Sequence, residues 1–215
     1  MYTFIQGDSL KVLSDFKDKS FDITLTSPPF KDEDVAVDYW DFYRVVMDEL
    51  FRVTKNVVII IHSSTKMNQI IQEFPPKRTL IWSKGLVKYS WRYNPIFVYQ
   101  MHEDYKVNKY IWSDTFGIPP IVGGNLKQHK YQDPTVLYVT LLKMFRENNN
   151  SVLDPFIGSG TTAKASSQLN MDCTGIDLVD YRSVKQIKGR GDQSLPYIKE
   201  EENYVRVIGK MSENL

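Results

Sequence analysis

Residues 151–177, SVLDPFIGSGTTAKASSQLNMDCTGID, indicate the fold class of this chain most clearly. Its first residues, 151–154, predict a short buried strand, residues 161–169 predict a helix, and residues 173–177 predict a second strand. A strand, a loop, a helix and a strand in this order form a unit that joins parallel strands of one sheet. We therefore expect an α/β fold with a mostly parallel sheet and helices on both faces.

The rest of the chain continues this alternation of strands and helices. Further strands are expected at residues 21–26, 57–61, 79–82 and 95–99, the last two as an antiparallel pair. Further helices are expected at residues 38–53, 65–74 and 133–145. Residues 101–133 are expected to be irregular, because aromatic residues, glycine and proline are mixed there without a period.

The loop between the strand and the helix of residues 151–177 carries Gly158 and Gly160. Glycines at this place permit a tight turn and a close approach of the backbone to a ligand. The loop is not a phosphate loop, because no Gly-Lys-Ser/Thr follows, and it lacks the third glycine of a dinucleotide fingerprint. Asp177 ends the next strand, where an acid accepts hydrogen bonds from ribose hydroxyls. The alternative is an ordinary tight turn followed by a surface aspartate.

A second motif, Ser27-Pro28-Pro29-Phe30, directly follows the expected strand at residues 21–26. Two prolines stiffen a loop and leave carbonyl groups without partners in the sheet. Ser27 and the Pro28 carbonyl are suited to accept hydrogen bonds from the exocyclic amine of a base, and Phe30 is suited to stack on a flipped-out base. The alternative is a proline loop without a site.

In this order, the two motifs resemble those of S-adenosylmethionine-dependent DNA amino-methyltransferases of the circularly permuted β group, in which the catalytic loop precedes the cofactor loop. The resemblance covers most of residues 4–181. Three further segments are similar to parts of that family: residues 7–10, 50–56 and 129–135. The resemblance implies a Rossmann-like methyltransferase fold in circularly permuted form.

The resemblance also implies a role for each matched position. The loop from Ser27 to Phe30 would hold the target base for direct attack on the sulfonium methyl group, so that proximity and orientation provide most of the catalysis. Asp177 would hold the ribose of S-adenosylmethionine, and Asp8 would lie near its adenine ring. The other cofactor-binding positions that the resemblance implies are Asp133, Thr135, Asp154, Phe156, Gly158, Ser159, Gly160 and Thr161. The reaction requires no metal.

The target base follows from one residue of the catalytic loop. In this family, Ser rather than Asp or Asn at position 27 favours N4 of cytosine, with N6 of adenine as the alternative. Methylation at carbon 5 is disfavoured, because it uses a cysteine nucleophile and the only cysteine, Cys173, falls in a predicted strand where a core position is expected. Two other classes stay open: an inactive module that binds S-adenosylmethionine or DNA, and a methyltransferase of RNA or of protein glutamine. Those methyltransferases usually carry Asn before the prolines and have the cofactor loop first.

Other titratable residues are weaker candidates. His62 follows the strand at residues 57–61 and is expected to be a capping or hydrogen-bonded strand-end residue. His102 and His129 lack partners at zinc spacing. The acidic residues at 32–34 and Asp38 are expected to lie in a solvated loop or at a helix N-terminus.

The charge of the chain is unevenly distributed. The 215 residues carry 27 Lys and Arg against 26 Asp and Glu, but residues 1–50 have a net charge of −6 and residues 77–130 a net charge of +6. Because DNA phosphates attract Lys and Arg, the basic segment is where we expect a DNA-binding surface. Its candidate residues are Lys106, Lys109, Tyr110, Lys127 and Lys130. A structured surface loop with aromatic residues in the core is the alternative.

We expect one catalytic domain over residues 1–181, with a small target-recognition insertion at about 101–128, and a basic-then-acidic tail at 182–215. The basic part of the tail, residues 182–190, is expected to contact phosphate or to extend the sheet.

No secretory signal is visible, and the longest apolar run, residues 57–61, is too short to span a membrane, so a cytoplasmic protein is expected. Its expected partner is DNA. The short recognition region suggests a short target sequence, a homodimer that reads a palindrome, or little specificity. A restriction nuclease that shares the target is a further possible partner, which the sequence does not reveal.

Overall fold

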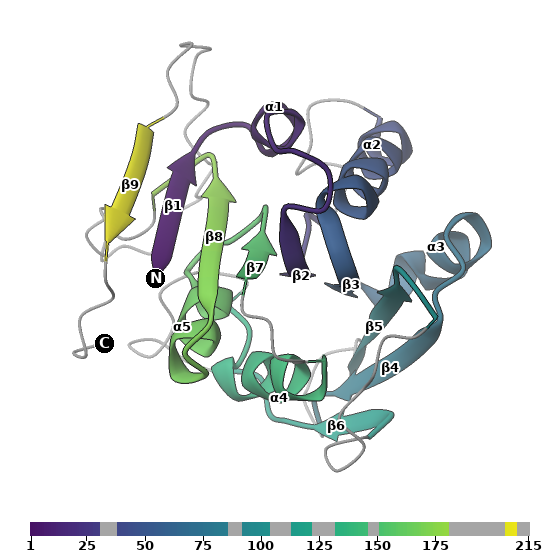
Figure 1. The fold of residues 1–215 in the computed structure, drawn as a ribbon. Helices are drawn as coiled ribbons and strands as arrows, with labels where there is room; N and C mark the ends of the chain where they lie inside the picture. Colours follow the sequence, from purple (N-terminus) through teal and green to yellow (C-terminus); the bar gives the residue numbers. More distant parts are fainter. Residues whose placement is uncertain are drawn as a thin grey trace, which may run out of the picture.

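The computed structural model describes residues 1–30, 38–85, 92–103, 113–121, 132–145 and 151–180, and the backbone of one more strand at Val205–Gly209. Within these residues the strands form one nine-stranded sheet in the order β6-β4-β5-β3-β2-β7-β8-β1-β9 (Figure 1). The strands are β1 (Tyr2–Gln6), β2 (Phe21–Thr26), β3 (Thr54–Ile61), β4 (Arg78–Ser83), β5 (Tyr93–Gln100), β6 (Thr115–Gly117), β7 (Ser151–Asp154), β8 (Asp172–Asp177) and β9 (Val205–Gly209). The helices are α1 (Ser9–Ser14), α2 (Tyr39–Val53), α3 (Met67–Glu73), α4 (Thr135–Phe145) and α5 (Thr161–Gln168), and a short 3₁₀ helix, η2 (Ser64–Lys66), precedes α3.

The sheet is mostly parallel, as the sequence predicts. Strands β3, β2, β7, β8 and β1 are parallel neighbours. The predicted antiparallel pair is β4 with β5, and β5 also runs antiparallel to β3. At the other end of the sheet, β9 pairs antiparallel with β1.

The chain changes direction across the sheet between β2 and β7. From β2 the chain continues to β3 on one side, whereas from β7 it continues to β8 on the other side (Figure 1). In open α/β sheets, ligands bind outside the carboxyl ends of the strands at such a switch point. A ligand site is therefore expected at the loops that follow the five parallel strands. These loops begin after Gln6, Thr26, Ile61, Asp154 and Asp177.

Helices cover both faces of the sheet, and β3 carries buried apolar side chains on both of its faces. Val57, Ile59 and Ile61 belong to one buried cluster with residues of α4 and α5. Val58 and Ile60 belong to a second cluster with residues of α1, α2 and α3. Because both faces are covered, the strand is a continuous apolar run and does not alternate between apolar and polar residues.

Cys173 lies in the core, as expected. It is buried on β8 in a small cluster with Tyr2, Phe4, Ile157 and Ala163. Burial raises the pKa of its thiol, so the group is a thiol and not a nucleophilic thiolate at neutral pH.

The structure adds elements that the sequence analysis does not predict. Residues 101–133, expected to be irregular, contain β6, which pairs with β4 through Trp82 opposite Phe116. A three-residue strand depends on this pairing partner and leaves no period in the sequence. Strand β1, helix α1 and strand β9 are further additions. The proposed DNA-contacting residues at 106–110 and 127–130, the acidic residues at 32–34, His129 and the basic part of the tail lie outside the described residues.

Within the described part of the chain, none of the helices combines the length and the apolar character that a membrane crossing requires.

Candidate active site

The two sequence motifs meet where β2 and β7 end. The hydroxyl of Thr26, the last residue of β2, donates a hydrogen bond to Asp154 Oδ1 at 2.7 Å, across 128 positions of the sequence. Ser27 follows Thr26 directly, and Asp154 is the last residue of β7, immediately before the glycine loop. A buried hydrogen bond at the switch point thus joins the proline loop to the glycine loop.

Asp154 holds three elements together. Its buried carboxylate also accepts hydrogen bonds from the Thr162 hydroxyl on α5 and from the Phe156 amide at 3.1 Å. Burial raises the pKa of the Asp154 carboxyl to about 6, although these three donors act to lower it. Since Asp154 is only 3% exposed, its carboxylate supports the glycine loop through the Phe156 amide from within the core.

The glycine loop has the backbone that its sequence predicts. Gly158 and Gly160 have φ angles of +49° and +82°, in the left-handed region that side chains disfavour. Gly160 is the N-cap residue of α5, so the loop leads directly into the helix N-terminus. The first amide groups of a helix have no carbonyl partner within the helix, so a turn of this kind offers hydrogen-bond donors to a ligand.

Asp177 stands beside this loop at the end of β8. Its Oδ2 accepts a hydrogen bond from the Gly158 amide at 2.9 Å, and its Oδ1 accepts one from the Val179 amide at 3.1 Å. Burial raises the pKa of this carboxyl as well. The Leu178 amide also donates to this carboxylate, so one of its roughly four acceptor positions remains for a hydroxyl donor. The next residue, Leu178, exposes 59% of its surface beside it.

The start of α1 adjoins the same loops. Asp8 is exposed and caps α1, because its Oδ1 accepts a hydrogen bond from the Leu10 amide at 2.9 Å. The Ser9 hydroxyl donates to the carbonyl of Pro155 in the glycine loop. The Gly7 amide donates to the Asp177 carbonyl at 3.0 Å, so β1 and β8 end side by side.

The start of α4 approaches the glycine loop from another side. The Thr161 hydroxyl lies 3.5 Å from the Asp133 carbonyl and 3.5 Å from the Ser159 hydroxyl. Asp133 Oδ2 accepts a hydrogen bond from the Tyr138 hydroxyl at 3.1 Å. Thr135 is the first residue of α4 and is half-buried.

The proline loop is supported by three residues that the sequence analysis does not assign to the site. Tyr138 is buried, and its phenol shares a side-chain hydrogen bond with Ser27. Tyr39 donates a hydrogen bond from its hydroxyl to the Pro29 carbonyl at 3.1 Å. The ring of Phe30 lies against the His62 imidazole, with 4.9 Å between ring centres.

The sequence contains a signal for only one of these three residues. His62 directly follows the buried residues 56–61 of β3, at the carboxyl edge of the sheet, where polar side chains reach a site. Tyr39 and Tyr138 lie at ordinary positions of helices, and nothing local distinguishes them from core tyrosines. Among the described residues, no cluster of His, Cys, Asp and Glu is arranged to hold a metal ion.

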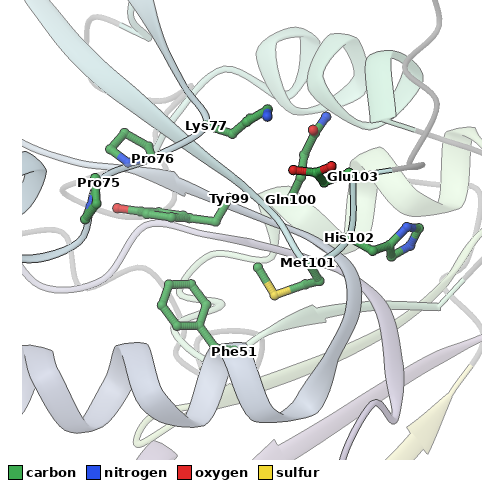
Figure 2. A pocket seen from close by; sticks show the side chains of 9 residues that line it. All are labelled: Phe51, Pro75, Pro76, Lys77, Tyr99, Gln100, Met101, His102 and Glu103. Carbon is green, nitrogen blue, oxygen red and sulfur yellow. The ribbon is translucent and has the colours of Figure 1, made fainter.

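A hollow elsewhere on the surface is separate from this site. Figure 2 shows its lining near Phe51, Tyr99, Met101 and Lys77. It contains Gln100, which pairs with Val57 near the start of β3. The hollow therefore lies at the edge of the sheet opposite the carboxyl ends of the parallel strands.

Comparison with known proteins gives one family and several relatives. The sequence profile of a DNA methylase family matches residues 21–186. The type II methyltransferase M.HpaI of Haemophilus parainfluenzae is 26% identical over 219 residues, which cover 81% of this chain and 69% of that protein. Among solved structures, the cytosine-N4-specific PvuII DNA methyltransferase superposes with a TM-score of 0.71 at 15% identity, covering 87% of this chain and 88% of the other. The complex of M1.HpyAVI with S-adenosylmethionine superposes with a TM-score of 0.63 at 18% identity, covering 85% and 98%.

Proposed function

Because this chain belongs to the family of N6/N4 DNA methylases, we propose that it transfers the methyl group of S-adenosylmethionine to N4 of cytosine in DNA. One observation supports this proposal more than any other. The Ser27-Pro28-Pro29-Phe30 loop is joined to the glycine loop by the buried hydrogen bond between Thr26 and Asp154. A loop suited to an amine and a loop suited to a cofactor therefore adjoin at the switch point of the sheet.

The residues around the glycine loop fit S-adenosylmethionine, which supplies an electrophilic methyl group on a sulfonium centre. The Asp177 carboxylate accepts three backbone amides and retains an acceptor position for a ribose hydroxyl. The exposed side chain of Leu178 offers an apolar surface to the adenine ring beside it. The positive φ angles of Gly158 and Gly160 let the backbone approach the methionine part closely.

The other cofactor positions that the resemblance implies lie around the same edge of the sheet, and we assign each of them to one part of the cofactor. We assign Asp8 to the adenine side, because it lies at the carboxyl end of β1 next to β8. We assign Phe156 to the methionine side, where it is half-buried and packs on Phe42 at 6.0 Å. The hydroxyl and carboxyl groups at the start of α4 and α5 would complete that side: Asp133, Thr135, Ser159 and Thr161. Asp154 would act indirectly, by holding the backbone of the glycine loop at Phe156.

The proline loop would hold the target base. The exocyclic amine of cytosine is a weak nucleophile, because its lone pair is delocalised into the ring. Ser27 and the Pro28 carbonyl would accept its two hydrogens, which favours a pyramidal nitrogen with its lone pair directed at the methyl group. Phe30 would stack on the base after it has left the duplex. Proximity and orientation then account for most of the rate.

The choice of cytosine rests on Ser27, and transfer to N6 of adenine is the second candidate. Purified protein, labelled S-adenosylmethionine and a set of duplex and single-stranded DNAs test both. Nucleoside analysis of the product should find N4-methylcytosine. Detection of N6-methyladenine instead would change the proposed target from cytosine to adenine and leave the site assignment intact. Absence of transfer to every DNA by folded protein that binds the cofactor would overturn the proposed activity.

A further inference from the structure

His62 is held in one protonation state by its neighbours. The side chain is fully buried at the end of β3, and its Nδ1 accepts a hydrogen bond from the Ser63 amide at 2.7 Å. Burial, with a smaller contribution from the charge of Lys66, lowers the pKa of the imidazole to about 3, so the ring is neutral. A neutral imidazole has one N–H group, which must therefore lie on Nε2. Nε2 is 2.6 Å from the Tyr39 hydroxyl oxygen and donates to it.

Tyr39 passes this orientation on to the proline loop. Since its oxygen accepts from His62, its own proton is directed to the Pro29 carbonyl at 3.1 Å. The Lys66 ammonium lies 3.8 Å from the centre of the Tyr39 ring and favours this placement of the ring. Hydrogen bonds thus run from the Ser63 amide through His62 and Tyr39 to the Pro29 carbonyl.

The same imidazole also supports the next residue of the loop. The Phe30 ring lies 4.9 Å from the His62 ring at an angle of 38°. Phe30 is therefore fixed twice, through the peptide that joins it to Pro29 and through its ring. We propose that Tyr39 and His62 are positioning residues that set the Phe30 ring and the adjoining amine-binding loop in place before the target base arrives. This inference rests on the proposed function, because it assigns the loop to a base.

A comparison within α2 separates positioning from simple packing. Tyr43 lies one turn after Tyr39, is fully buried and also packs on His62, with 5.5 Å between ring centres. Its hydroxyl makes no hydrogen bond among the described residues. A buried tyrosine ring alone therefore satisfies the packing here, whereas the hydroxyl of Tyr39 has a directed task.

The test compares Tyr39→Phe with Tyr43→Phe, which remove the same atom from neighbouring tyrosines. Methyl transfer is measured in single turnovers with saturating S-adenosylmethionine and a DNA that the unaltered chain methylates. We expect Tyr39→Phe to slow transfer about ten- to a hundredfold, because misplaced reacting groups lose orientation. The dissociation constant for S-adenosylmethionine, measured by calorimetry, should stay within about twofold, and Tyr43→Phe should change neither quantity. Equal rates for the two variants would overturn the proposal.

Two further measurements keep the proposal testable if Tyr39→Phe does not fold. His62→Gln retains an N–H group for the Tyr39 hydroxyl and should transfer methyl groups faster than His62→Leu. In ¹⁵N spectra of the unaltered protein, His62 should show a protonated Nε2 and an unprotonated Nδ1. The opposite tautomer would refute the hydrogen bond that His62 is inferred to donate to Tyr39. These spectra need no substrate. If the unaltered protein shows the expected tautomer but methylates no DNA, the proposed function is refuted. The hydrogen bonds from Ser63 through His62 and Tyr39 to Pro29 would still stand.

Discussion

The carboxyl group of Asp154 is buried and accepts three hydrogen bonds, two conditions with opposite effects on its pKa. Enclosure disfavours the charged form, and the three donors favour it. Enclosure has the larger effect, since the pKa of the group rises to about 6. The junction of the two loops therefore contains a group that titrates close to neutral pH.

This pKa predicts a pH-dependent stability. The folded value lies above the ordinary value of about 3.9, so the folded state binds the proton more tightly than the unfolded chain does. The contribution to stability is present below about pH 4 and is lost as the pH rises through about 6, at a cost of about 2–3 kcal/mol. Asp154→Asn removes this titration. In urea unfolding, the variant should gain stability relative to the unaltered chain between pH 5 and pH 7.5. A constant difference across this range would contradict the assignment.

One substitution in each half of the site should affect a different quantity: the affinity for S-adenosylmethionine in one case and the turnover number in the other. Asp177→Ala removes the acceptor of the Gly158 amide, which is also the group that we propose to hold the ribose. We expect it to weaken S-adenosylmethionine binding by about ten- to a hundredfold, the effect of losing charged hydrogen bonds. Ser27→Ala should leave that binding unchanged and lower the turnover number. Calorimetry and steady-state kinetics measure the two effects, and the reverse pattern would refute the division of roles.

Among elements, the contact between β8 and the glycine loop depends on one glycine. Ile157 is buried against β8, and its amide donates to the Ile176 carbonyl at 3.0 Å. A Cβ atom added at Gly175 would lie 2.7 Å from the Ile157 side chain. The residue at 175 therefore lacks a side chain so that the loop can lie close to the strand.

We accordingly expect Gly175→Ala to destabilise the fold by about 1–3 kcal/mol, because overpacking displaces the loop or the strand. Gly117→Ala on β6 is the matched control, since no atom lies within 4 Å of an added Cβ there. Its effect should stay within about 0.5 kcal/mol. Thermal unfolding of both variants measures the difference. Similar melting temperatures would show that the contact between Ile157 and Gly175 adapts without cost.

Elements with a strong pattern of their own were predictable from the sequence, and elements that depend on a partner were not. The apolar run of β3 and the amphipathic period of α2 lie close to their predicted positions. Helix α1 has only six residues, too few to be stable alone, and is fastened by its Asp8 cap and by the hydrogen bond from Ser9 to Pro155. Strand β1 depends in the same way on β8, to which it is parallel.

The site was predictable in part for the same reason. The proline loop and the glycine loop are continuous motifs, so the sequence names their residues. Tyr39, His62 and Tyr138 act through contacts across 10 to 111 positions, which no local pattern records. The order of strands brings them together, because the carboxyl ends of parallel neighbours share one edge of the sheet.

At the scale of the whole molecule, charge is the remaining feature that bears on DNA. The chain is nearly neutral in total, with an acidic segment at residues 1–50 and a basic one at residues 77–130. A protein that neutralises phosphates releases counterions, so its affinity for DNA falls as salt rises. We expect the basic segment to provide these contacts, with Lys106 and Lys109 among them.

Changing Lys106 and Lys109 together to Ala should weaken DNA binding and reduce the slope of log affinity against log salt by about 1.8, which corresponds to two phosphate contacts. Lys17 and Lys55 provide a matched control outside the basic segment. Both are exposed near the starts of β2 and β3, at the edge of the sheet away from the candidate site. Replacing this pair removes the same charge and should leave the slope unchanged. Fluorescence anisotropy with labelled duplex between 50 and about 300 mM salt measures both slopes. Equal slopes for the two double variants would mean that Lys106 and Lys109 do not contact DNA phosphates.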